Sequence, residues 1–226
     1  RERFPEVRFS FEGESYENQK TMDAMKRVVP AILILMFLII AVTFRSFGQA
    51  IIVFLLIPFS LVGVLWGHYI QGYITSILSL FGAIALMGIV VNDSLVLVSA
   101  FNNRLKRGMA FREALYDAGL SRFRPVLLTS LTTIGGLGPL VFERSRQAQF
   151  LSPMAISIAY GLLFGTILTL IMLPSMLVLL NRAKLYLYRA ILRKKLSAEE
   201  IEPAVREEEF VRRENEPDSS DEGCNR

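Results

Sequence analysis

The sequence is poor in the two residue types that most often bind metals or form cross-links. Its 226 residues include one cysteine, Cys224, and one histidine, His68. A single cysteine excludes a disulfide framework within the chain and a cysteine-based zinc site. A single histidine excludes a histidine metal cluster. The net charge of +4 is also small, so the distribution of charge along the chain is more informative than its sum.

Apolar residues, in contrast, are abundant and gathered in long blocks. They make up 52% of the chain, and the mean hydropathy is +0.42, which excludes disorder of the whole chain. Five blocks approach the roughly 20 residues that a membrane span needs. They are 28–44, 50–70, 77–101, 125–142 and 150–180. The alternative is a large soluble protein with several buried helices, but such blocks without Lys or Arg seldom recur in soluble cores. We therefore expect an all-α membrane protein with a bundle of five transmembrane helices.

The basic residues predict how these spans are oriented. Loop 102–124 carries six Lys and Arg residues, and six more lie in 182–195, whereas connection 67–76 has none. Because cytoplasmic loops are enriched in Lys and Arg, we expect loop 102–124 and tail 182–226 in the cytoplasm and the N-terminal segment on the outer side of the membrane. Trp66, Tyr69 and Tyr73 would then lie at the outer interface. The tail has mixed charge and is expected to be largely disordered.

The start of the chain indicates a piece of a longer protein. It begins with Arg1 rather than Met, and no signal peptide precedes the segment expected outside. Residues 7–12 alternate between apolar and polar side chains, which is typical of a strand. We therefore expect residues 1–19 to end a larger extracytoplasmic domain and residues 20–181 to form the transmembrane domain.

A shorter amphipathic segment lies in the basic loop. Residues 108–119 place Phe111, Ala114, Leu115 and Ala118 on one helical face, and Gly119 is a plausible stop. We expect a short cytoplasmic helix that either lies on the inner leaflet or packs on the ends of the spans.

The third block contains an acidic residue in the sequence GIVVNDSLVLVSAF. Asp93 lies about four residues from the middle of the block, or ~6 Å along a helix axis. An ionised Asp near a helix centre costs about 2.5–3.5 kcal/mol on insertion scales. Asn92 and Ser94 flank it and can form hydrogen bonds to a carboxylate. We interpret Asp93 as an intramembrane proton site; the alternative is a polar group that only joins helices, worth ~0.6 kcal/mol on average.

The fourth block contains hydroxyl residues and glycines in the sequence TSLTTIGGLGP. Thr129 and Thr133 are one turn apart and share a face with Gly136. This row could relay protons or stabilise Asp93. The alternative is that the hydroxyls bond to their own helix while Gly135, Gly136 and Gly138 allow close packing.

The remaining small and aromatic residues fit structural roles. The fifth block carries small residues at four-residue spacing, which let another helix approach closely. They are Ser157, Gly161, Gly165 and Thr169. We interpret His68 as an interfacial aromatic residue. The glycines form no phosphate-binding loop, and no nucleophile–base pair or nucleic-acid motif is visible, so we expect no enzyme, cofactor or metal site.

Several stretches together resemble a known family. They are GESYENQ, FRSFGQAIIVFLLIPFSLVGVLWG, GIVVNDSLVLV and RFRPVLLTSLTTIGGLGPL. In order, spacing and expected topology, the chain from about Phe11 to Asn181 is similar to the C-terminal transmembrane half of resistance–nodulation–division (RND) efflux permeases, the inner-membrane pumps of multidrug systems. The five spans would be helices eight to twelve of a twelve-helix fold, and residues 1–19 would end the second periplasmic porter region.

The resemblance implies a proton-driven antiporter in the bacterial inner membrane. Such pumps are usually homotrimers that work with a periplasmic adaptor and an outer-membrane channel. The family relay pairs two acidic residues on helix four with a Lys on helix ten; here Asn92 stands at the Lys position and Asp93 follows it. Arg122 and Thr129 match helix-eleven positions implicated in proton coupling. The candidate proton relay is therefore Asp93, Asn92, Ser94, Thr129 and Arg122.

Two other functions fit the same sequence. The chain could belong to a lipid, sterol or protein-export relative within the same superfamily, which the upstream periplasmic domain would reveal. It could also be a structural or assembly subunit without transport, which would tolerate Leu in place of Asp93.

Overall fold

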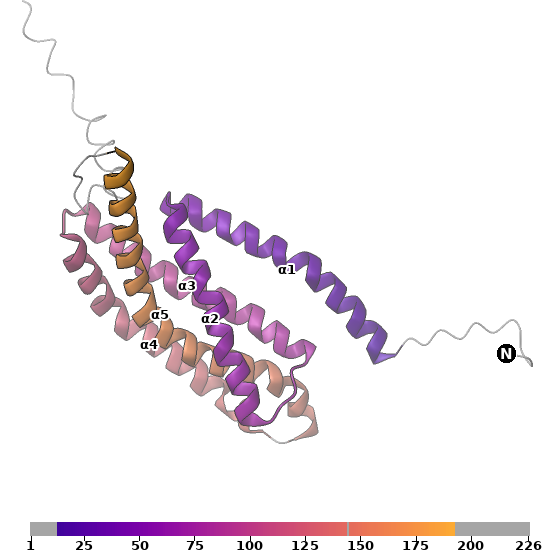
Figure 1. Ribbon diagram of the computed structural model, residues 1–226. Helices are drawn as coiled ribbons and strands as arrows, with labels where there is room; N and C mark the ends of the chain where they lie inside the picture. The colour runs from indigo at the N-terminus through magenta and orange to yellow at the C-terminus, as the bar shows by residue number, and fades with distance from the viewer. Residues whose placement is uncertain (1–12, 144, 193–226) are drawn as a thin grey trace, which may run out of the picture. The chain divides into compact units, whose positions relative to one another are not determined.

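The described part of the chain, residues 13–143 and 145–192 of the computed structural model, consists of five α-helices (Figure 1). They are α1 (Glu14–Phe44), α2 (Phe47–Gln71), α3 (Ile77–Lys106), α4 (Phe111–Phe142) and α5 (Arg146–Leu192). Each contains a stretch long and apolar enough to cross a membrane. The expected fold class, an all-α membrane protein with five spans, is confirmed.

The description of the N-terminal segment begins at Gly13, directly before α1. The residues predicted to form a strand, 7–12, lie outside the described residues. Residues 14–19, at the end of the segment expected outside the membrane, form the first turns of α1.

The chain divides into two compact units between Met36 and Phe37, inside α1. The second unit contains the last turns of α1 and all of α2 to α5. In this unit the ring of Phe37 meets the ring of Phe54 on α2 edge to face, with centroids 5.2 Å apart. Ile40 and Ala41 are buried, so the end of α1 is packed against its own unit.

Short capped connections set the direction of the helices. Ser46 accepts a hydrogen bond from the Gln49 amide at 3.4 Å and starts α2 directly after α1. Gly72, with φ 69°, ends α2 in the left-handed conformation that favours glycine. Ser76 and Ser79 form a capping box at the start of α3. Because these connections are short, successive helices from α2 to α5 run antiparallel.

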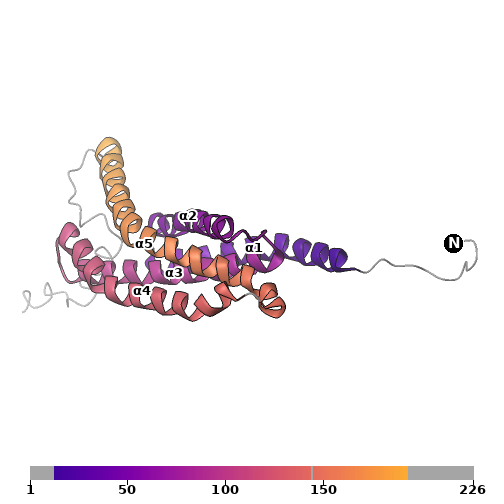
Figure 2. The same cartoon turned by 90° about the horizontal axis from the view of Figure 1, so that it is seen from below.

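Helix α5 is the central packing element of the second unit. It lies beside α2, α3 and α4, as the two views show (Figures 1 and 2). It is bent along its length in Figure 2, and Pro153 and Pro174 both lie inside it. A proline inside a helix removes one backbone hydrogen bond, which permits bending without ending the helix.

Small residues allow α5 to approach its neighbours closely, as expected. A Cβ added at Gly161 would lie 2.3 Å from Leu86 Cδ2 on α3, and one at Gly63 of α2 would lie 2.5 Å from Phe164 Cβ. Ser157 and Thr169 are also buried. The packing interpretation of the small residues in the fifth block is confirmed for these helices.

The glycines of α4 behave differently. A Cβ added at Gly135, Gly136 or Gly138 would meet nothing within 4 Å among the described residues. The interpretation that these glycines allow close packing is therefore wrong for this part of the chain. Sequence spacing shows that small residues line one face of a helix, but it does not show whether another helix packs on that face.

Helix α4 is longer than the span expected from hydropathy. It runs without interruption from Phe111 to Phe142, so Gly119 does not end a separate helix. A glycine inside a helix costs only about 1 kcal/mol, which the surrounding packing offsets. The apolar face predicted for residues 108–119 is correct, since Phe111, Ala114 and Ala118 are buried.

The outer surface of the described residues is rich in large apolar side chains. Val42, Ile74 and Ile171 are among those most exposed, and Ile34, Leu65 and Leu128 also face outward. Continuous apolar exposure of this kind fits a lipid environment rather than water.

Candidate functional site

Contacts between α3 and α5 fix the depth of Asp93 in the bundle. The two helices run parallel and touch once per turn. The touching pairs are Gly82 with Ser157, Leu86 with Gly161, and Val90 with Gly165. Asp93 follows Val90 by three residues, so it lies at the depth of Leu168 on α5.

Contacts between α4 and α5 show which residues of α4 lie at the same depth as Asp93. Helices α4 and α5 run antiparallel, with Ser152 Oγ donating to the Leu140 carbonyl at 3.1 Å and Ser130 Oγ 2.7 Å from Thr166 Oγ1. Counting from these contacts puts Thr129 and Ser130 within about one turn of the depth of Asp93. Two residues of the expected relay, on different helices, therefore share one level of the bundle.

Asp93 itself is half-buried on α3. Within residues 13–143 and 145–192 its carboxyl group has no hydrogen bond or ion pair. Neighbouring Asn92 is exposed and likewise without a partner in this part of the chain. Ser94 is buried and donates to the Val90 carbonyl at 2.7 Å, so its proton is used by its own helix. The carboxyl group is thus a polar group inside an apolar span without a partner among the described side chains.

Thr129 is exposed on α4 and bonds to its own helix. Its hydroxyl lies 3.0 Å from the Pro125 carbonyl and 2.9 Å from the Val126 carbonyl. Thr132 and Thr133 bond to backbone carbonyls one turn earlier in the same way. The three threonine hydroxyls lie along α4 as expected, but each donates its proton to a backbone carbonyl rather than to the next hydroxyl.

Arg122 lies on α4, roughly 9 Å along the axis from the depth of Asp93 and toward the α3–α4 connection. It is half-buried, and its Nε atom is buried without a hydrogen-bond partner in the described chain. No hydrogen bond or ion pair among the described residues joins any two members of the expected relay. The structure brings Asp93 and Thr129 to one depth and leaves both Asp93 and the Arg122 Nε unpaired.

Sequence reasoning missed the hydroxyl pair at this level. Ser130 and Thr166 are both buried, and Ser130 Oγ also lies 2.9 Å from the Val126 carbonyl. Since Ser130 has one proton and directs it to Val126, Thr166 is the donor in the contact between the two hydroxyls. A threonine within an apolar block carries no signal of such a partner, because the pairing depends on the register of α4 and α5.

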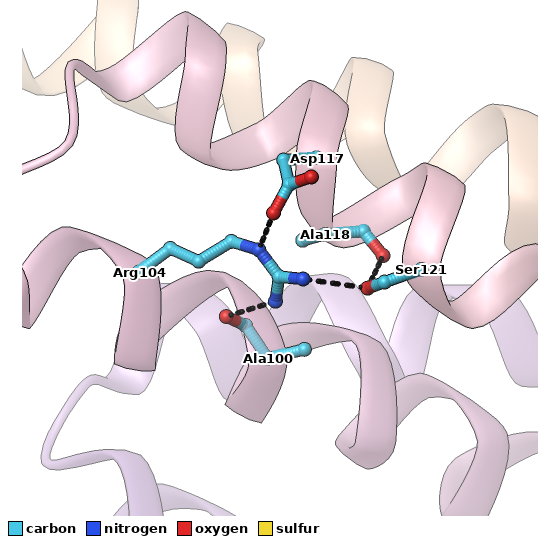
Figure 3. A network of polar contacts seen from close by, with 5 residues as sticks. All are labelled: Ala100, Arg104, Asp117, Ala118 and Ser121. Atoms are coloured by element: carbon cyan, nitrogen blue, oxygen red, sulfur yellow. Dashed lines mark hydrogen bonds and ion pairs between the residues drawn. The ribbon is translucent and has the colours of Figure 1, made fainter.

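Sequence reasoning also missed the polar network that holds the α3–α4 connection (Figure 3). The Nε of Arg104 donates to the carboxylate of Asp117, and its two terminal nitrogens donate to Ser121 Oγ at 2.7 Å and to the Ala100 carbonyl at 3.0 Å. One guanidinium thus joins the end of α3 to the first turns of α4. This contact fixes how α4 leaves the connection on its way to Arg122 and Thr129.

Comparison with known proteins agrees with this architecture. A swarming motility protein, SwrC of Bacillus subtilis (strain 168), is 32% identical over 145 residues, which are 64% of this chain and 14% of that protein. An X-ray crystal structure of a heavy metal efflux pump matches with a TM-score of 0.67 and 26% identity over 79% of this chain and 18% of the pump chain. A second crystal form of such a pump matches with a TM-score of 0.64 and 27% identity over 74% of this chain and 17% of the pump chain. The chain therefore spans less than a fifth of the length of these relatives.

The match to a family covers as much of this chain as the longest of these single matches. The model of the AcrB/AcrD/AcrF family matches residues 3–181, which include the first four spans and most of α5. This agrees with the resemblance to RND permeases that the sequence motifs indicated. The chain belongs to the AcrB/AcrD/AcrF family.

Proposed function

We propose that this chain is the C-terminal transmembrane part of a proton-driven efflux transporter that exchanges protons for substrate. The observation that carries the proposal is Asp93, a carboxyl group within an apolar span and without a partner among the described residues. Insertion of an ionised Asp costs about 2.5–3.5 kcal/mol, so a group that stays there without structural contacts needs a functional reason.

The chemistry of the proposal is reversible protonation of Asp93. The neutral carboxyl group is tolerated in the apolar span, whereas the carboxylate favours an arrangement that gives it water or a donor. A proton falling through 100 mV releases about 2.3 kcal/mol, which is enough to bias two packings of a helix bundle. Alternate access of Asp93 to the two sides would thereby drive movement in the rest of the transporter.

The other relay members have distinct roles in this proposal. Asn92 and Ser94 offer hydrogen bonds next to Asp93, and Thr129 offers hydroxyl lone pairs at the same depth. Arg122 supplies a positive charge nearer the α3–α4 connection. Its Nε, which has no partner among the described residues, would donate a hydrogen bond to a carboxylate. In the packing described above these groups are separate, so the relay would be completed by a different packing or by further helices.

The proposal includes a location and a set of partners. The distribution of Lys and Arg supports the inner membrane, with the N-terminal segment in the periplasm and the tail in the cytoplasm. The proposal divides the chain into the end of a periplasmic domain (1–19), a transmembrane domain (20–181) and a cytoplasmic tail (182–226). The family supports a homotrimer that works with a periplasmic adaptor and an outer-membrane channel in multidrug efflux.

Transport assays of the complete transporter test the role of Asp93. Asp93→Asn keeps the size of the side chain but removes the exchangeable proton, so we expect loss of ethidium efflux with normal membrane insertion. Glu113→Gln is the matched control, because Glu113 is an exposed acidic residue in the first turn of α4. We expect that control to transport at the wild-type rate.

Efflux that survives substitution of Asp93 would contradict the proposal. Wild-type efflux by Asp93→Asn would remove the proton-site proposal. If Asp93→Leu is also tolerated and vesicles show no proton flux, the chain belongs to a structural or assembly subunit instead.

A further inference from the structure

His68 lies in a different environment from the one that its sequence position indicated. It is 4% exposed and packed between α2 and α5, not spread over the membrane interface. Its Nε2 lies 2.9 Å from Ser157 Oγ on α5. Its Nδ1 is buried and has no hydrogen-bond partner in the described chain. A buried imidazole nitrogen without a partner costs about 1–3 kcal/mol, so this position needs an explanation.

The contacts of Ser157 determine which nitrogen carries the proton. Ser157 Oγ lies 3.0 Å from the Pro153 carbonyl, which can only accept, so the hydroxyl proton is directed there. The imidazole must then donate from Nε2 to Ser157. Neutral His68 is therefore held as the Nε2–H tautomer.

The helices are in close contact around this hydrogen bond. A Cβ added at Gly67 would lie 2.5 Å from Tyr160 Cβ, and the side-chain amide of Gln71 donates to the Tyr160 hydroxyl at 2.9 Å. The Tyr73 amide donates to the His68 carbonyl at 3.2 Å, which ties the α2–α3 connection to the same residue. His68 thus forms part of a contact that closes α2 against α5 at this end of the bundle.

Few titratable groups surround His68. Asp, Glu, Lys and Arg are absent from 50–71 on α2, 77–92 on α3, 125–142 on α4 and 150–181 on α5. The titratable residues at this end of the described chain are Tyr69, Tyr73 and Tyr160, Glu143 just beyond the end of α4, and Arg146 at the start of α5. Ser157 is level with Gly82 on α3, so Asp93 lies about 16 Å deeper along the axis. No carboxylate on the packed helix faces is available to neutralise a charged imidazole.

We propose that His68 is a second proton-binding group, whose protonation opens the α2–α5 contact at the α2–α3 end of the bundle. An added proton would have to enter at Nδ1, and in the closed packing the charged ring has only a backbone contact to Tyr73 and no counter-ion among the described residues. The imidazolium therefore favours an arrangement in which α2 and α5 separate and water reaches the ring. In the neutral state the Nε2–H bond to Ser157 keeps the contact closed. This switch is independent of Asp93 and of the proposed transport.

Spin labels test the opening directly. Ile70 on α2 and Leu151 on α5 are exposed positions near the contact, and labelling at both requires Cys224→Ser because Cys224 is the natural cysteine of the chain. In the full protein in lipid vesicles we expect one short distance at about pH 8 and a second, longer population at about pH 5.5. His68→Gln keeps an amide donor for Ser157 but cannot titrate, so it should keep the short distance at both pH values. Asp93→Asn should retain the pH response even if transport is lost.

Two results would overturn the proposal. One is an unchanged distance distribution in the wild-type protein at the lower pH. The other is a pH response that persists in His68→Gln, because another group would then be responsible.

Ser157→Ala is a second variant that removes the acceptor, and we expect the longer population already at about pH 8. Nitrogen-15 NMR of the labelled imidazole, identified by its loss in His68→Gln, should show the Nε2–H tautomer at that pH; an Nδ1–H tautomer would also contradict the proposal.

Discussion

Gln49 at the start of α2 and Asn102 near the end of α3 form a reciprocal amide pair. Gln49 Nε2 donates to Asn102 Oδ1 at 3.1 Å, and Asn102 Nδ2 donates to Gln49 Oε1 at 3.0 Å. Both side chains are buried, so the pair gives each amide hydrogen bonds that water cannot supply there. The pair joins two helices at the end opposite to His68.

This pair predicts a non-additive loss of stability. Gln49→Leu leaves the Asn102 amide buried and unsatisfied, and we expect the free energy of unfolding to fall by about 1–3 kcal/mol. Asn102→Leu should have a similar effect. The double variant should lose less than the sum of the two, because no orphaned amide remains. Unfolding in mixed micelles measures all three; strictly additive losses would show that the amides are not coupled.

Close packing of α2 against α5 predicts a strong effect at Gly63. A Cβ there would lie 2.5 Å from Phe164 Cβ and 2.9 Å from the Tyr160 carbonyl oxygen. We therefore expect Gly63→Ala to lower the free energy of unfolding by about 1–3 kcal/mol. Gly135→Ala is the control, since nothing lies within 4 Å of the added carbon among the described residues, and its effect should be neutral or stabilising by about 0.5–1 kcal/mol. Equal losses in both variants would contradict the packing described for α5.

The ion pair between Arg104 and Asp117 predicts a small effect despite its prominence in Figure 3. The side chain of Asp117 is 53% exposed, and an ion pair that solvent reaches contributes only about 0.2–1 kcal/mol. Asp117→Ala should therefore destabilise the protein by less than about 1 kcal/mol, with a smaller difference at high salt. Thermal unfolding at two salt concentrations checks this, and a loss that does not depend on salt would assign the effect to packing.

Thr129 is predicted to act through its hydroxyl group rather than its shape. Thr129→Val keeps the volume and removes the hydroxyl, and we expect efflux by the complete transporter to fall about tenfold, the effect of losing about 1.4 kcal/mol of hydrogen bonding. Thr129→Ser should restore most of the rate. Thr132→Val is the matched control, because Thr132 is also exposed on α4 and bonds to its own helix. If both valine variants transport equally well, Thr129 has no special role.

The number and type of the helices could be predicted from the sequence because both depend on local composition. Five apolar blocks of sufficient length require five helices, since backbone groups in lipid must be satisfied within the segment. The ends were less accurate. Gly119 and Pro125 are compatible with a continuous α4, so hydropathy alone cut that helix short.

The candidate site could be predicted as a set of residues but not as an arrangement. Asp93 was identified because a carboxylate in an apolar block is unusual in any fold. Its depth relative to Thr129 became known only from the contacts of α5 with α3 and α4. The same contacts revealed Thr166, which no local pattern distinguishes from a lipid-facing threonine.

The sequence by itself determined that this chain is a five-span membrane protein with one acidic residue deep in a span, because these properties are fixed by the solvation of individual residues. Only the tertiary structure decided which polar groups are partners. His68 and Ser157 are 89 positions apart, and Gln49 and Asn102 are 53 apart. Hydrogen bonding between such groups depends on helix register and direction, and these are set by the packing of whole faces rather than by any one residue.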